Sequence, residues 1–114
     1  MKICLIGSAK FEQDFIDANK ELTLMGHIVY SLGAFPSDQG SKDWYNEQQK
    51  VMLDCVHLRK INESDVVVLL DRDNYIGEST FKELTYSLVF DKIVISANTL
   101  EFSYETINKR IRGE

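Results

Sequence analysis

Short runs of apolar residues alternate along the chain with longer segments in which apolar residues recur every three or four positions. The short runs are typical of buried strands, and the recurring positions are typical of amphipathic helices. We expect strands at residues 2–6, 27–30, 65–71 and 92–96. We expect helices at residues 10–25, 43–62, 80–90 and 103–112.

Strand and helix alternate throughout, which predicts an α/β domain with a parallel sheet between two layers of helices. The segment 65–71 is nearly continuous in Val and Leu, as expected for a strand that helices cover on both faces. With right-handed crossovers we expect the strand order 2-1-3-4. The predicted fold is therefore a small Rossmann-like or flavodoxin-like three-layer sandwich of at least four parallel strands. The length of 114 residues suits one domain, residues 1–114.

The apolar spacing also predicts which side of each helix faces the sheet. In the first helix the expected inward residues are Phe11, Phe15, Ala18, Leu22 and Met25. In the second they are Val51, Cys55 and Leu58, and in the third Phe81, Leu84 or Thr85, and Leu88. Tyr86 and Phe90 fall beside the inward face of the third helix, where a small core cannot easily cover them. We therefore expect a homo-oligomer.

Charge and cysteine content narrow the classes of function. The net charge is -5, so a DNA or RNA polymer would meet a mostly repulsive surface. Cys4 and Cys55 lie in apolar patterns and form no Cys-x-x-Cys pair, which predicts buried, reduced thiols in a cytoplasmic protein. The N-terminal apolar run is too short for a signal peptide, and no stretch approaches the length of a membrane span, so we expect no membrane contact.

Several common sequence patterns of ligand and metal sites are missing from the chain. The turn at residues 7–10, Gly-Ser-Ala-Lys, lacks the G-x-G-x-x-G fingerprint, the Walker A pattern and the acidic residues of a response-regulator receiver. His27 and His57 lack metal-ligand spacing with cysteine or carboxylate residues, so we predict no metal site. We expect His27 at a strand edge and His57 on a helix surface.

The strand order predicts where a ligand would bind. In open α/β sheets ligands bind outside the carboxyl ends of the strands, where the strand order reverses. That edge brings residues 7–10 and 71–79 together, although they are far apart in the sequence. We therefore expect these two loops to form one crevice.

Four short motifs carry a resemblance to a known family. They are strand-Gly7-Ser8, Gly26-His27-x-Val29, Lys60-Ile61-x3-Asp65, and Tyr75-Ile76-Gly77-Glu78-Ser79-Thr80 ahead of Glu83. Over about residues 2–95 the chain resembles the nucleoside 2-deoxyribosyltransferase-like superfamily, which includes nucleoside and nucleotide N-glycosidases. The resemblance implies a Rossmann-like sheet, dimers or larger oligomers, and cleavage or transfer of the base–deoxyribose bond by a helix glutamate. It implies neither a metal nor an organic cofactor.

The chain departs from the family pattern at two places. Members that act on nucleotides often have an arginine after strand one, where this chain has Lys10, which would hold a phosphate as a point charge. Members that transfer the sugar often continue Glu-Leu-Gly-x-Ala after the glutamate. Here Thr85 and Tyr86 are bulkier and would narrow the pocket.

Glu83 has two competing interpretations. Thr80 and Glu83 have the spacing of an [ST]-x-x-E capping box, in which Glu83 would turn back to the amide of Thr80. In the interpretation that the resemblance implies, Glu83 is a nucleophile that attacks the anomeric carbon, and the helix N-terminus keeps it ionised. Asp71 and Glu78 would then bind sugar hydroxyls or handle the proton of the leaving base, unless they are solvated loop carboxylates.

The remaining candidates are substrate-binding residues. Gly7, Ser8, Gly77 and Ser79 would offer amides and hydroxyls to a phosphate or sugar, with turn and cap roles as the alternative for the serines. Trp44 would stack on a base unless it packs in the core. We expect the protein to bind a nucleoside or nucleotide and to cleave or transfer its N-glycosidic bond. The alternatives are a non-catalytic nucleotide-binding or sensing module on the same fold, and a scaffold for protein association.

Overall fold

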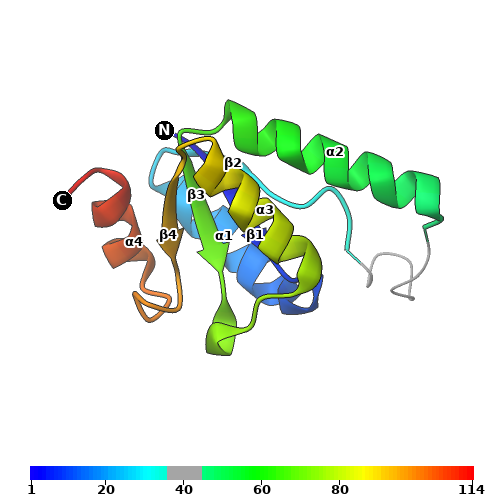
Figure 1. The fold of residues 1–114 in the computed structure, drawn as a ribbon. Coiled ribbons are helices and arrows are strands. Elements are labelled where there is room, and N and C mark those ends of the chain that lie inside the picture. Colours follow the sequence, from blue (N-terminus) through cyan, green and yellow to red (C-terminus); the bar gives the residue numbers. More distant parts are fainter. Residues whose placement is uncertain (36–44) are drawn as a thin grey trace.

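The computed structural model describes residues 1–35 and 45–114, and it confirms the predicted architecture. Four parallel strands form one sheet in the order β2-β1-β3-β4 (Figure 1). The strands are β1 (Lys2–Gly7), β2 (Ile28–Tyr30), β3 (Val66–Leu70) and β4 (Ile93–Ser96). The helices are α1 (Glu12–Leu24), α2 (Glu47–Glu63), α3 (Glu78–Val89) and α4 (Tyr104–Ile111), with short 3-10 turns η1 (Ala9–Phe11) and η3 (Arg72–Asn74).

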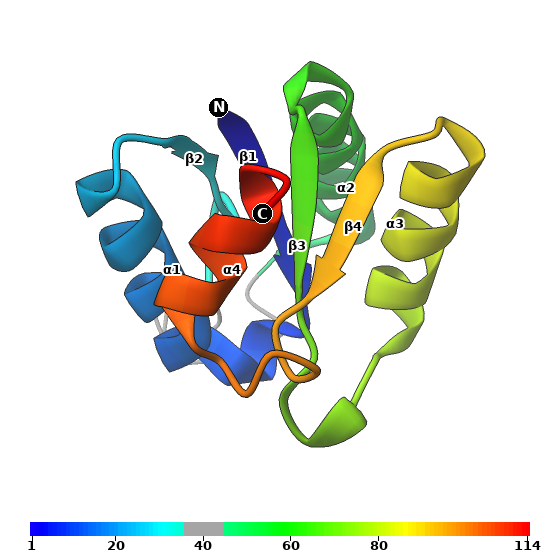
Figure 2. The same cartoon turned by 90° about the vertical axis from the view of Figure 1, so that its left-hand side faces the viewer.

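The helices cover the two faces of the sheet in pairs. Figure 2 shows α1 and α4 on one face and α2 and α3 on the other. Alternate residues of β1 divide between two apolar clusters, with Ile3 and Leu5 facing α1 and α4, and Cys4 and Ile6 on the opposite face. The strand in the middle of the sequence, β3, is buried along its whole length, as its continuous Val and Leu content predicted.

The two central strands approach closely where they end. Gly7 pairs with Leu70 at the carboxyl ends of β1 and β3. A Cβ atom on residue 7 would lie 2.9 Å from the carbonyl oxygen of Leu70, which is closer than real Cβ contacts allow. Glycine at this position therefore lets β1 run close to β3 and turn into Ser8 at the ligand-binding edge of the sheet.

The predicted inward face is confirmed for the core of α1 and wrong for much of α2 and α3. Phe15, Ala18 and Leu22 of α1 are buried. In α2 the prediction holds for Leu58, which packs against the core, but Val51 and Cys55 are exposed, and the buried residues are His57 and Ile61.

The position of α2 over the sheet explains why the predicted inward residues Val51 and Cys55 are exposed. The amino-terminal half of α2 extends beyond the sheet (Figure 1), so its apolar residues have no strand beneath them. The predictions of a buried Cys55 thiol and of a surface His57 are both wrong. The helix turns the face that carries His57 toward the sheet and leaves Cys55 exposed.

In α3 Leu84 packs against the apolar cluster of its face, as predicted, but Phe81 and Leu88 point outward. Phe81 is 62% exposed and Leu88 is 58% exposed, whereas Thr80 and Ser87 are buried. The spacing rule identifies residues that share a face but not which face meets the sheet, and here the small side chains face inward. None of the helices in the described part of the chain is long and apolar enough to cross a membrane.

Candidate functional site

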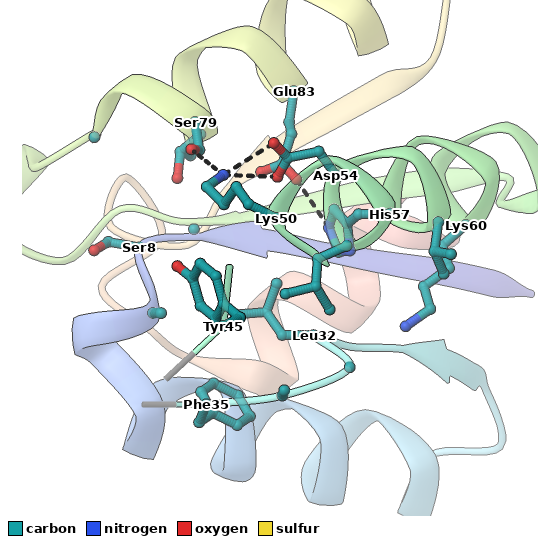
Figure 3. Close-up of a pocket in the computed structure, with 18 of the residues that line it drawn as sticks. Ser8, Leu32, Phe35, Tyr45, Lys50, Asp54, His57, Lys60, Ser79 and Glu83 are labelled. Carbon is teal, nitrogen blue, oxygen red and sulfur yellow. Dashed lines mark hydrogen bonds and ion pairs between the residues drawn. The ribbon is translucent and has the colours of Figure 1, made fainter. Parts of the chain in front are cut away.

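A pocket of about 330 Å³ lies at the carboxyl end of β1, between the sheet edge and the helices α2 and α3. Its walls come from the turn after β1, the loop after β2, one face of α2 and the first half of α3 (Figure 3). Pockets of this size and position are where open α/β sheets bind small molecules. The predicted crevice is present in part: residues 7–9 and 77–79 line it, whereas Lys10 and residues 71–76 do not.

The pocket has walls of contrasting chemistry. Leu32, Phe35 and Tyr45 form an apolar and aromatic wall on one side (Figure 3). Lys50 and Glu83 lie on the opposite side, with other polar groups of α2 and α3. A flat aromatic group would fit against the first wall, and a polar or reacting group would face the second.

Glu83 reaches this pocket from α3 and is not part of a helix cap. The helix begins at Glu78 with Gly77 as its N-cap, so Thr80 lies inside the helix and the predicted capping box is wrong. Glu83 lies beyond the first turn, where the helix dipole has little effect. Its side chain is only 13% exposed.

The surroundings of Glu83 favour its neutral form. Burial, together with the nearby charge of Asp54, raises the pKa of Glu83 from 4.5 to about 7, while Lys50 acts in the opposite direction. The expectation that the helix N-terminus keeps this carboxylate fully ionised is therefore corrected. Near neutral pH Glu83 is present in both forms, which suits a group that exchanges protons during a reaction.

His57 lies beneath Glu83 and is buried. Its Nε2 atom is 3.0 Å from the carbonyl oxygen of Leu5, 3.5 Å from Oε2 of Glu83 and 3.8 Å from Sγ of Cys4. A carbonyl can only accept, so Nε2 carries the proton and donates it to Leu5. Burial lowers the pKa of His57 to about 4, and the charge of Lys60 adds to that effect. The ring is therefore neutral at pH 7, and its contact with Glu83 is not an ion pair at that pH.

Lys50 links α2 to α3 above the pocket. Its Nζ atom donates to both carboxylate oxygens of Asp54 at 2.9 Å and to Oγ of Ser79 at 3.3 Å (Figure 3). This bridge holds the polar side of the pocket together. Lys60 also lines the pocket, and its Nζ donates to the carbonyl oxygen of Ser31.

The structure brings most of the predicted site residues together. Those that line the pocket are Gly7, Ser8, Gly77, Glu78, Ser79 and Glu83. Trp44 lies outside the described residues. Lys10 does not line the pocket, because its Nζ lies 3.4 Å from the centre of the Tyr75 ring in a cation–π contact.

Asp71 does not line the pocket either, and its position indicates a structural role. The side chain is buried, and its two carboxylate oxygens accept from Oγ of Ser96 at 2.6 Å and from the backbone amide of Asn98 at 3.0 Å. These bonds join the end of β3 to the chain that follows β4. A carboxylate held in this way has little freedom to act on a ligand.

The sequence analysis missed the contribution of α2. Lys50, Asp54 and His57 recur at spacings of four and three, so they share one helix face, and all three line the pocket. This recurrence of a polar residue at each turn was the sequence signal that could have identified the pocket-lining face of α2. It was obscured because the apolar residues of α2 were assumed to face the sheet.

A second hollow, of about 410 Å³, lies between α2 and α3 and shares part of the same wall. Leu58, Lys82 and Tyr86 line only this groove. Lys50, Asp54 and Glu83 line both cavities, together with Glu78 and Ser79. The polar residues on this side of the pocket therefore contact both the pocket and the groove between α2 and α3.

The site contains no cluster suited to a metal ion among residues 1–35 and 45–114: no three histidine, cysteine or carboxylate side chains gather as ligands there. Comparison of the chain with protein-family models, with curated proteins and with solved structures found no match in any of the three. The fold itself is a small flavodoxin-like or Rossmann-like α/β domain.

Proposed function

We propose that this pocket binds a nucleoside or nucleotide and that Glu83 cleaves or transfers its N-glycosidic bond. One observation carries the proposal: a largely buried carboxylate, Glu83, faces a pocket whose opposite wall is aromatic. The motif resemblance around residues 75–83 supports the same chemistry. The proposal requires neither a metal nor an organic cofactor.

The two walls suggest how the substrate lies. The base would pack against Phe35 and Tyr45, and the sugar would face Glu83. The ionised carboxylate would attack the anomeric carbon as the bond to the base breaks, and the base would leave with the electron pair and take a proton from water. Attack by water or by a second base on the same carbon would then release the sugar and free Glu83.

The burial of the Glu83 side chain favours a second candidate, a binding or sensing module without turnover. A pKa of about 7 leaves much of Glu83 protonated at neutral pH. A protonated carboxyl group donates a hydrogen bond but cannot attack a sugar carbon. In this alternative Glu83 would recognise the ligand rather than react with it.

Incubation with deoxynucleosides and their monophosphates separates the two candidates. Free base would be followed by chromatography, with ligand binding measured by calorimetry on the same panel. We expect base release from at least one compound, faster at pH 8 than at pH 6, because attack needs the ionised carboxylate. Binding without release from any compound would instead establish the module.

The matched control is Glu83→Gln, which preserves size and hydrogen-bonding capacity but cannot carry the negative charge. We expect this variant to bind the intact substrate and to release base more slowly by orders of magnitude. Unchanged release by Glu83→Gln would remove Glu83 from the reaction. If neither the wild type nor the variant binds any member of the panel, the substrate class is wrong.

A further inference from the structure

The side of the pocket opposite the aromatic wall contains a second carboxylate, Asp54, which no sequence motif indicated. We propose that Asp54, held in place by Lys50, is a positioning residue that controls the charge of Glu83. The proposal builds on the proposed function, because it assigns a role to that same carboxylate. Its central measurement does not depend on whether the protein is an enzyme.

Geometry is the first support. Asp54 and Glu83 reach the same wall from different helices, α2 and α3, and both line the pocket and the groove behind it. In Figure 3 the side chains of Asp54 and Glu83 lie on the same side of the pocket as Lys50, whose ammonium group donates to Asp54. The Lys50 ammonium is 2.9 Å from each carboxylate oxygen of Asp54, so Lys50 forms its ion pair with Asp54.

The different exposure of Asp54 and Glu83 explains which of the two carboxylates carries the negative charge. The side chain of Asp54 is 53% exposed and ion-paired with Lys50, whereas that of Glu83 is largely buried. Water and the ammonium group therefore stabilise a negative charge on Asp54. A second negative charge on Glu83 would lack that stabilisation and would be repelled by the first.

The groups around Glu83 come from three elements. Lys50, Asp54 and His57 face it from α2, and Cys4 approaches the same region from β1. Glu78 and Lys82 belong to its own helix and pair with each other at 3.7 Å on the exposed side. His57 is neutral near pH 7, and burial raises the pKa of the Cys4 thiol to about 12, so neither carries charge there. Asp54 and Lys50 are thus the charged groups that oppose each other at Glu83.

Removing Asp54 therefore changes two things in the same direction. The repulsion disappears, and Lys50 loses the carboxylate that holds it, so its ammonium group becomes available to Glu83. Both changes favour ionised Glu83. We expect Asp54→Asn to lower the titration midpoint of Glu83 by about one pH unit, which is a tenfold change in the ratio of its two forms.

The test is a carboxyl NMR titration of the full chain, with the Glu83 signal assigned by its absence in Glu83→Gln. Asp54→Asn should lower the midpoint, and Asp54→Glu, which keeps the charge, should leave it near the wild-type value. Glu63→Gln is the matched control, because it removes one negative charge from an exposed position of the same helix. A midpoint that moves equally in Asp54→Asn and Glu63→Gln, or in neither, would overturn the proposal.

Lys50→Met supplies the complementary measurement. Without the cation, the charge of Asp54 acts on Glu83 unopposed, so the midpoint should rise. If Lys50 transfers to Glu83 when Asp54 is removed, the two shifts will not add in the double variant. Additive shifts would contradict the transfer. Circular dichroism checks that each variant is folded.

The pH dependence of base release links this result to function. The midpoint of the rate profile should move with the NMR midpoint in Asp54→Asn. If the NMR midpoint moves but no substrate is turned over, Asp54 controls Glu83 and the proposed glycosidase function fails. If base is released and the midpoint does not move, the proposed function stands and the role of Asp54 fails.

Discussion

The two faces of the sheet carry helix pairs with different composition and different tasks. The face with α1 and α4 has one continuous buried apolar cluster, in which Phe15 is only 1% exposed. The face with α2 and α3 has a smaller apolar cluster and buries His57, Thr80 and Ser87 as well. The polar wall of the pocket is built on this second face, whereas Leu32 and Phe35 of the opposite wall pack against the cluster of the first face. The first layer supplies most of the buried apolar residues, although it also buries Asp14 of α1, and the second layer buries more polar side chains among fewer apolar ones.

The largest effect that we expect is on the free energy of unfolding, and replacing one phenylalanine in each helix layer tests it. Phe15→Ala should lower the free energy of unfolding by about 3–5 kcal/mol, because it removes a buried ring from the α1 and α4 layer. Phe81→Ala on α3 should change it by no more than about 0.5 kcal/mol, because that ring is mostly exposed. Urea unfolding of both variants provides the measurement. Similar losses would show that the two layers do not differ in this way.

A smaller effect concerns the two titrating groups of the second layer. Folding raises the pKa of Glu83 from 4.5 to about 7, so Glu83 makes stability fall as pH rises through that window. Folding lowers the pKa of His57 from 6.5 to about 4, so His57 makes stability rise with pH over its own window. The two slopes oppose each other between pH 4.5 and 6.5.

Glu83→Gln removes the first slope and leaves the second. The difference in the free energy of unfolding, Glu83→Gln minus wild type, should increase by about 2–3 kcal/mol as pH rises from 4.5 to 6.5. Unfolding in urea at several pH values across that interval measures the difference. A wild-type and a variant curve that run parallel would show that Glu83 does not titrate in this range.

The smallest effect concerns association. The outer surface of α3 and the start of β4 expose large apolar side chains, including Leu88, Phe90 and Ile93, and the homo-oligomer predicted from the sequence remains a prediction. We expect Leu88→Glu to raise the dissociation concentration at least tenfold, a change of about 1.4 kcal/mol. Leu24→Glu, at an exposed position of α1, should have no such effect. Light scattering over a concentration series tests both, and a wild type that is monomeric at every concentration would end the idea.

The architecture could be predicted from the sequence because it depends on local periodicity. The parallel sheet follows from strand–helix alternation. The strand order predicted a crevice between residues 7–10 and 71–79, of which residues 7–9 and 77–79 line the pocket. The orientation of α2 and α3 could not be predicted in the same way. It depends on where each helix lies over a sheet of limited width, and this is a property of the assembled fold.

The candidate site shows the same division. Ser8 and Ser79 were identified because they lie at the edge that the topology selects, and Glu83 because of the motif resemblance. Asp71 was misjudged because a carboxylate after a strand has the same sequence appearance whether it faces a ligand or receives hydrogen bonds from Ser96 and Asn98. Distances between side chains on different elements decide such cases, and periodicity does not contain them.

The hydrogen bonds of Asp71 have a consequence for the energetics of ligand capture. The loop that leads from β3 to the start of α3 is fastened where it begins, by Asp71 to the chain after β4 and by Arg72, which donates twice to Asp14 on α1. Backbone that is already fixed has little conformational freedom left to lose when a ligand arrives. The segment that leads to Gly77 at the pocket is therefore anchored at one end, which lowers the entropy that it would lose on binding.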